Sequence, residues 1–123
     1  MAFINDRVFD NGLSAITSEA TRLDLCSQEP TTYTEATSTY TLANKTSISV
    51  SSPTDGDSSG RKVVVSAITG GSVTSDGTVT HWAVSDTSNT RLLATGALSA
   101  SQAVTSGYSF DLAAIDITIP DAA

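Results

Sequence analysis

The second half of the chain constrains the fold most, because it has the pattern of one β-strand after another. Runs rich in β-branched residues alternate with period two and are separated by turn-forming residues. These runs cover residues 62–68, 71–75, 78–85, 91–96 and 115–119. Asp76-Gly77 predicts a two-residue hairpin turn between two of them, since that turn needs positive φ at its central residues. Pro120 ends the last run because proline cannot donate to a strand ladder.

Several of these runs carry apolar side chains on both faces. Val63, Val65 and the stretch from Trp82 to Val84 fit strands that are covered on two sides. The sequence therefore predicts a mainly β fold, a small antiparallel β-sandwich or partly open barrel, formed as a single domain by residues 1–123. Candidate core anchors are Trp82, the largest side chain, and the strand leucines Leu92, Leu93 and Leu98.

The N-terminal segment differs, since Phe9, Leu13, Ile16 and Ala20 recur at helical spacing. We expect a short helical segment in residues 1–20, capped by Asp6, that lies across the sheet and covers one layer.

Four shorter segments connect this helix to the strands of the second half. Arg22 to Cys26 alternates like a strand, and Ser47 to Val50 does the same. The segment from Thr31 to Ala43 is ambiguous between a helical turn near Tyr33 and an extended piece. Residues 51–60 collect turn-forming residues and are expected to form an exposed loop.

Charge and composition limit the classes of partner. The 123 residues are the length of one ordinary domain, and the net charge of −7 repels phosphate backbones and anionic lipids. We therefore expect no nucleic acid and no membrane among the partners. No apolar run is long enough to span a bilayer, and the start of the chain lacks the pattern of an export signal, which predicts synthesis in a cytoplasm.

The chain carries few groups that fit catalysis. His81 is the single histidine, so it has no second imidazole as relay or metal ligand, and a structural role is expected. Cys26 is the single cysteine, which excludes an intrachain disulfide; we interpret it as a packed strand residue, with a reactive thiol as the alternative. The sequence predicts no enzyme, no catalytic residues, no metal and no cofactor.

One acidic segment resembles a metal-binding motif. Asp55 to Gly60 has the opening spacing of a calcium loop, with oxygen ligands at alternate positions and glycine at the sixth. Ser66 stands where such a loop needs a bidentate glutamate, and strands are expected on both sides. We interpret the segment as a solvated acidic hairpin loop, with calcium binding as the alternative.

Three motifs in the second half resemble small virion proteins of tailed bacteriophages and prophages. They are the Thr80-His81-Trp82-Ala83 strand followed by Asp86, the Leu92-Leu93-Ala94-Thr95-Gly96-Ala97-Leu98 strand, and the turn Val104-Thr105-Ser106-Gly107-Tyr108-Ser109-Phe110. Segments at 5–13, 26–33, 60–63 and 115–120 are also similar to that group, so the resemblance spans most of the chain. Members of the group are described as capsid decoration, tail or tail-fibre components.

The resemblance implies a non-enzymatic structural protein of the virion, made in the host cytoplasm. The leading hypothesis is a capsid decoration or cement protein on the outer surface of the head. Its expected partners are the major capsid protein and copies of itself, in a homo-oligomer such as a trimer. Candidate contact residues lie on the N-terminal helix and the acidic loop: Phe9, Leu13, Ile16, Asp55 and Asp57.

The alternative hypothesis is a tail or tail-fibre component that contacts a host-surface glycan. Tyr33, Tyr40 and Tyr108 are candidates to stack on sugar rings, although packing under loops or in a subunit contact is the favoured interpretation.

Overall fold

The structure is a computed structural model that describes residues 5–57 and 60–119, the side chain of Asp6 excepted. It is mainly β with a helix near the N-terminus, which confirms the predicted fold class. The elements follow in the order α1 (Asp6–Glu19), β1 (Arg22–Cys26), the π-helical turn η1 (Glu35–Thr39), β2 (Thr41–Thr46), β3 (Thr54–Asp55), β4 (Arg61–Val65), β5 (Ile68–Val73), β6 (Gly77–Asp86), β7 (Arg91–Val104), β8 (Ser109–Leu112) and β9 (Ile115–Ile119).

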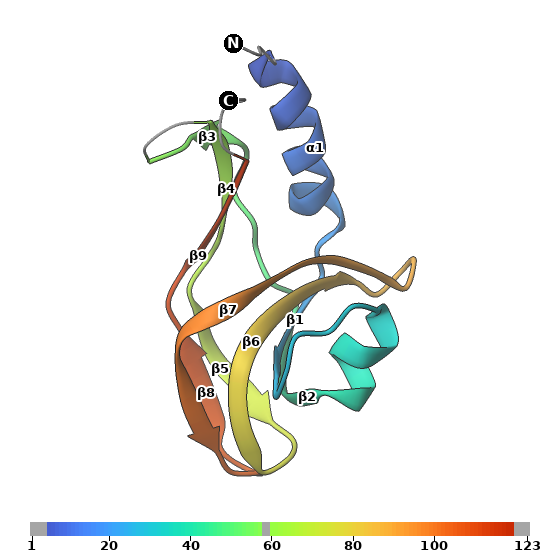
Figure 1. Ribbon diagram of the computed structural model, residues 1–123, viewed down its shortest axis with the longest axis vertical. Helices are drawn as coiled ribbons and strands as arrows, with labels where there is room; N and C mark the ends of the chain where they lie inside the picture. Colours follow the sequence, from blue (N-terminus) through green and yellow to red (C-terminus); the bar gives the residue numbers. More distant parts are fainter. Residues whose placement is uncertain (1–4, 58–59, 120–123) are drawn as a thin grey trace.

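Two antiparallel sheets organise the molecule. Six strands in the order β7-β6-β1-β2-β5-β8 curl into a half-barrel, and three strands in the order β3-β4-β9 form a smaller sheet (Figure 1). The smaller sheet extends away from the half-barrel, and α1 lies beside it and contacts β4. The helix therefore covers the smaller sheet and does not lie across the larger one.

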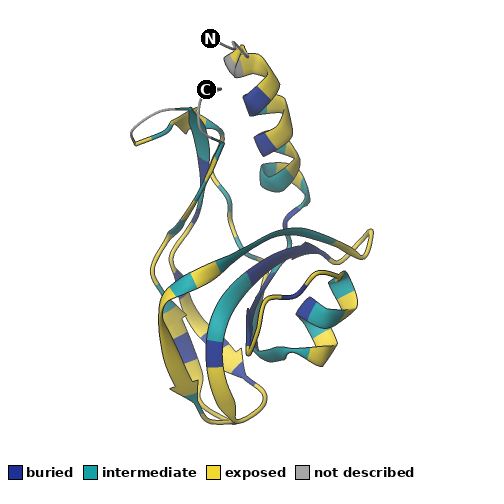
Figure 2. Cartoon of the chain, viewed as in Figure 1, coloured by how far each residue is buried: buried dark blue, intermediate teal, exposed yellow. Residues whose placement is uncertain are grey.

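The main core fills the concave side of the half-barrel. Leu23 and Leu25 of β1 are buried there with Val79 and Val84 of β6 and Phe110 of β8. The alternate residues of β1 face the other side, where Cys26 packs with Ala36 of η1 and Ala83 of β6. β1 is thus buried on both faces, and Figure 2 shows β1 and the adjoining end of β6 in dark blue.

The four candidate core anchors lie at the margin of the core. Trp82, Leu93 and Leu98 are half-buried and pack against the main cluster, and Leu92 packs against the smaller cluster under η1. The fully buried positions belong to other apolar residues, such as Leu23, Val65 and Val84.

Two aromatic rings lie flat on glycines of the neighbouring strand. Trp82 pairs with Gly96, where a Cβ would lie 2.5 Å from the indole ring, and Phe110 pairs with Gly71, where a Cβ would overlap the phenyl ring. In both pairs glycine has no side chain, so the aromatic ring occupies the space above it. This close packing of ring on glycine stabilises a sharply curved sheet.

The predicted hairpin at Asp76-Gly77 is wrong. β5 and β6 are not neighbours, because the β1–β2 pair lies between them in the sheet. Gly77 has φ 155°, far from the value that a two-residue hairpin turn requires, and the Asp76 carboxylate accepts a hydrogen bond from the Ser106 backbone N–H at 2.7 Å. The segment connects two strands that are not neighbours in the sheet, so it does not form a hairpin.

The helix α1 and the segment 31–43 agree in part with the predictions from the sequence. Phe9 and Leu13 are buried on one face of α1, as predicted, and Ala20 is buried just after the helix ends. The helix is capped by Asn5, whose side chain accepts from the Arg7 N–H, and not by Asp6. The segment 31–43 contains both of its alternatives, because η1 is followed directly by β2.

The strand boundaries also differ in places. The segment from Ser47 to Val50 makes only an isolated bridge between Val50 and Val65, because Ser47 has φ 58°. The predicted exposed loop contains β3, which pairs with β4, and the unpredicted strand β8 follows the Gly107 turn.

Candidate interaction surfaces

One end of the molecule contains α1 and the β3–β4 hairpin, the two segments that the sequence predicts for partner contact. We call it the α1 end. The Arg61 guanidinium on β4 binds the Asp10 carboxylate of α1 at 2.8 Å and the Asp55 carboxylate of β3. It also donates to the Pro53 carbonyl oxygen at 3.5 Å. A single cation therefore ties the helix to the β3–β4 hairpin, and the neighbouring carboxylates raise the pKa of Arg61.

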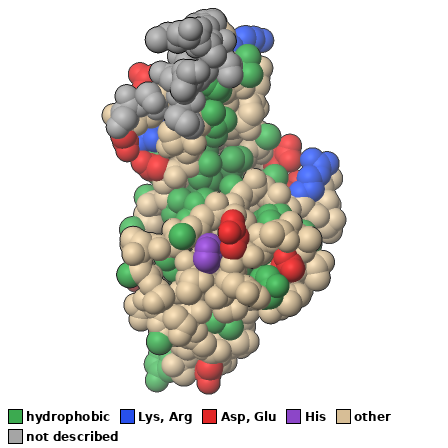
Figure 3. All heavy atoms as spheres, in the orientation of Figure 1, with side chains coloured by type: hydrophobic (Ala, Val, Ile, Leu, Met, Phe, Trp, Pro, Cys, Tyr) green, Lys and Arg blue, Asp and Glu red, His purple; other side chains and the backbone are tan. Residues whose placement is uncertain are grey.

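A second ion pair network lies on the same sheet. The Lys62 ammonium group contacts the carboxylates of Asp57 at 2.7 Å and Asp116 at 3.0 Å. The hydrogen bond and charge of Lys62 lower the pKa of Asp57. Figure 3 shows the acidic and basic side chains together near this end of the molecule.

The candidate calcium ligands Asp55 and Asp57 thus each face a cation of the same sheet. Within residues 5–57 and 60–119, no group of three or more His, Cys, Asp or Glu side chains is placed to hold a metal ion. Asp55 and Asp57 themselves are exposed, so both carboxylates are accessible to a partner.

The three contact candidates on α1 are more buried than the two aspartates. Phe9 and Leu13 are 5% and 1% exposed, so they stabilise the packing of α1 and offer almost no surface to a partner; Ile16 is half-buried. Val8 is 62% exposed and is the apolar side chain that α1 presents outward. The helical spacing had selected the inward face, and Val8 was missed because it lies outside that spacing.

The single histidine and the single cysteine are cross-strand partners, since His81 of β6 lies opposite Cys26 of β1 in the larger sheet. His81 is half-buried on β6 and its Nδ1 lies 2.8 Å from the Thr80 hydroxyl. Cys26 is fully buried, and desolvation raises the pKa of its thiol to about 12, so the thiol stays protonated at neutral pH. This favours the interpretation of Cys26 as a packed strand residue.

The buried carboxylate of Asp24 belongs to a structural network. Arg22 binds both oxygens of Asp24, at 2.9 and 2.8 Å, and the Thr41 hydroxyl donates to it at 2.7 Å. Arg22 also donates to the Thr37 carbonyl oxygen of η1 at 3.3 Å. Burial raises the pKa of Asp24, and these hydrogen bonds act against that shift. The network holds η1 against the convex face of the sheet.

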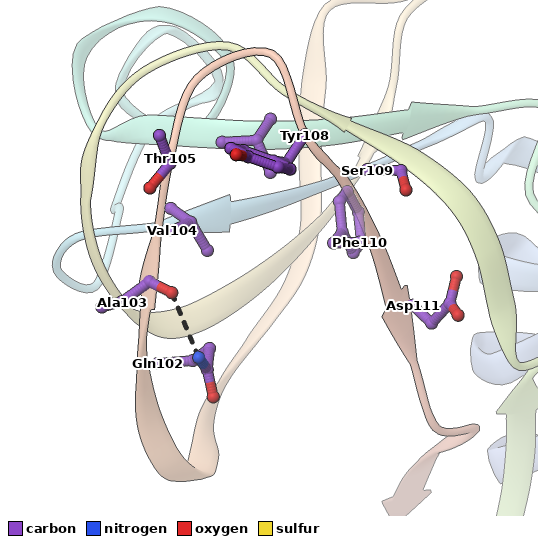
Figure 4. Close-up of a pocket in the computed structure, with 9 residues that line it drawn as sticks. Gln102, Ala103, Val104, Thr105, Tyr108, Ser109, Phe110 and Asp111 are labelled. Atoms are coloured by element: carbon purple, nitrogen blue, oxygen red, sulfur yellow. Dashed lines mark hydrogen bonds between the residues drawn. The ribbon is translucent and has the colours of Figure 1, made fainter.

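A wedge-shaped groove lies at the opposite end, between β7 and β8. The two strands are joined by the turn at residues 105–108 and diverge from it, and Val104 and Phe110 project into the space between them (Figure 4). The groove has a volume of about 390 Å³ near the turn and continues along the strands as two further hollows of about 210 and 220 Å³. We call it the β7–β8 wedge.

The three candidate tyrosines have different surroundings. Tyr108 lines the β7–β8 wedge and is 70% exposed, whereas Tyr33 and Tyr40 are half-buried. The Tyr40 hydroxyl donates to the Glu35 carboxylate at 3.3 Å. Tyr40 packs against the cluster of Cys26, Ala36 and Ala83, and Tyr108 is the tyrosine with an exposed ring.

Comparison of the chain with protein-family models, with curated proteins and with solved structures gives no match. In the described part of the chain, no helix is long and apolar enough to cross a lipid bilayer. The interaction surfaces must therefore be interpreted from their own geometry and from the motifs of the sequence.

Proposed function

We propose that the chain is a non-enzymatic structural protein of a tailed-phage virion, and that it decorates the outer surface of the head. The observation that carries the proposal is the ordered set of virion-protein motifs in the sequence. Two of them form the adjacent strands β6 and β7, and the third is the turn that leads from β7 into β8. The motifs are thus neighbours in space, which fits a shared structural framework.

The α1 end is the proposed docking surface for the major capsid protein. It combines the exposed Val8 with the exposed carboxylates of Asp55 and Asp57, while Arg61 and Asp10 hold the helix and hairpin together. A small apolar contact with a charged rim is a common form of protein interface. The net charge of −7 fits a location outside the shell, away from packaged DNA. Several copies around a local symmetry axis of the head remain part of the proposal.

The test uses heads that lack this chain, purified from the phage or prophage that encodes it, and the purified chain added back. Co-sedimentation and an image of the decorated head should show binding and added density on the shell. Val8→Glu should reduce binding at least about tenfold, because it places a charge in the apolar contact. The matched control is Tyr108→Ala, at the opposite end, which should bind normally.

The tail hypothesis is favoured by one observation, the free ring of Tyr108 in the β7–β8 wedge. An exposed aromatic ring at the edge of a groove is suited to stacking on a sugar. If an antibody to this chain labels the tail or fibres of the intact particle and leaves the head unlabelled, the decoration proposal is wrong and the tail proposal replaces it.

A further inference from the structure

The β7–β8 wedge is bordered by two unpaired strand edges. β7 and β8 are the outer strands of the six-stranded sheet, so in the described residues each has one strand neighbour, β6 for the first and β5 for the second. Exposed edges are usually protected by proline, by several charges or by a covering segment. Residues 98–104 and 109–114 contain no proline, and Asp111 is their one charged residue.

The backbone of β8 is oriented to accept a further strand. The Tyr108 carbonyl accepts from the Val73 N–H at 2.9 Å, and Phe110 lies opposite Gly71. Backbone groups of successive strand residues point to opposite edges, so Ser109 and Asp111 direct theirs away from β5 and toward the wedge.

On the β7 border of the wedge, Gln102 makes a local hydrogen bond with the next residue. The Gln102 side-chain amide donates to the Ala103 carbonyl oxygen at 3.1 Å (Figure 4).

The floor of the wedge is apolar. Leu25 and Val79, which are buried in the main core, line it together with Leu98 and Leu112. Side chains of a strand alternate between its two faces. A strand in the wedge would therefore place every second side chain on this floor, and would complete the core of the half-barrel.

We infer that the β7–β8 wedge binds an extended segment of a different protein, which adds a strand along the β8 edge. The segment has apolar residues at alternate positions and a lysine or arginine beside Asp111, the single charged residue in the lining of the wedge. A second copy that pairs edge to edge is disfavoured as the occupant, because residues 98–104 and 109–114 contain no lysine or arginine to place beside Asp111. The inference holds whichever particle the chain belongs to.

The test uses synthetic peptides of about seven residues, a typical strand length, with valine at alternate positions. One peptide has lysine at both ends, a second has glutamate instead, and a third is the lysine peptide with N-methyl groups on the backbone nitrogens of one edge, which removes strand pairing and keeps the side chains. Trp82, the single tryptophan, lines the wedge and reports binding by its emission. NMR hydrogen exchange reports protection of the Ser109 and Asp111 amides.

The lysine peptide should shift the Trp82 emission saturably and slow amide exchange at Ser109 and Asp111 at least about tenfold. The glutamate peptide should bind about threefold or more weakly, which is the size of an exposed charge effect. Asp111→Asn keeps an oxygen for the Gly70 N–H and should abolish the difference between the two peptides. Glu29→Gln, outside the wedge, is the matched control and should preserve it.

Three results would overturn the inference. The first is no saturable response to the lysine peptide up to about 1 mM, the weak limit of specific binding. The second is equal binding of the N-methylated peptide, which would mean that backbone pairing contributes nothing. The third is protection of the Ser109 and Asp111 amides that rises with the concentration of the chain alone, which would make a second copy the occupant.

Discussion

The replacement of Gly96 by alanine should destabilise the protein, although alanine is ordinarily the better residue for folding. The added Cβ would lie 2.5, 2.6 and 2.8 Å from three atoms of the Trp82 indole. Ordinary contact distances are about 3.5 Å or more, so the ring must move by about 1 Å. Overpacking of this kind costs about 1–3 kcal/mol, and the smaller backbone entropy of unfolded alanine offsets about 0.4–1 kcal/mol.

The expected net loss is about 1–2 kcal/mol of unfolding free energy, or a decrease in Tm of about 4–8 °C. Urea unfolding followed by Trp82 emission and by circular dichroism measures it. Gly12→Ala is the matched control: Gly12 lies inside α1, where the nearest foreign atom to a new Cβ is 4.0 Å away, so the same change should stabilise by up to about 1 kcal/mol.

A double variant tests the cause. With Trp82→Leu in place the ring is gone, and Gly96→Ala should then be neutral or slightly stabilising. If Gly96→Ala alone is as stable as the unchanged protein and its emission is unaltered, the ring does not depend on the missing side chain, and the reasoning about these aromatic–glycine pairs is refuted.

Three further predictions concern Cys26, Asp86 and Thr90. The pKa of about 12 at Cys26 predicts that thiol reagents modify the native protein at neutral pH at least about a hundredfold more slowly than the urea-unfolded chain. Hydrogen bonds from Asn89 and Ser88 lower the pKa of Asp86, so its contribution to stability is present above the unfolded pKa of about 4 and is lost as the pH falls through the folded value. The stability difference between the unchanged protein and Asp86→Asn should therefore shrink between pH 7 and pH 3 in urea titrations. Thr90 has φ 52°, a conformation that costs a side chain about 1 kcal/mol, so Thr90→Gly should raise or preserve Tm, and a clear decrease would contradict this.

Sequence patterns located strands well where a dense apolar alternation was bounded by clear breaks. β1 at Arg22–Cys26 and β9 at Ile115–Ile119 have the predicted bounds. The end of β7 was missed because residues 98–104 consist largely of Ser, Ala and Gln, which have a weak strand signal. β8 was missed because its four residues follow a turn signal directly.

Pairing between strands was harder to predict than their existence. Asp76-Gly77 has the composition of a hairpin turn, but the β1–β2 pair separates β5 from β6. A turn motif indicates only the local backbone conformation. It does not determine which two strands of the sheet become neighbours. The charged residues show the same limit, because Arg61 was unremarkable in sequence and its role depends on Asp10, which lies far from it in the chain.

The candidate surfaces were predictable only in outline. The helix and the acidic segment were selected by sequence, but their junction through Arg61 and the outward position of Val8 depend on the tertiary fold. The β7–β8 wedge had no sequence signal, since it results from two strand edges that diverge after a turn.

The closeness of α1 and β9 has a practical consequence for attaching labels or passengers. Gly12 of α1 and Ile119 of β9 are neighbours, with a new Cβ at Gly12 only 4.0 Å from the isoleucine, and α1 begins at the end of the molecule where β9 ends (Figure 1). A fluorescent protein attached ahead of α1 or after β9 would lie close to the surface that contains Val8. A failure to decorate heads would then reflect obstruction. An epitope inserted in the exposed connection at residues 87–90 avoids that region. A circular permutant that is opened at the same connection would place a fused protein there, away from Val8.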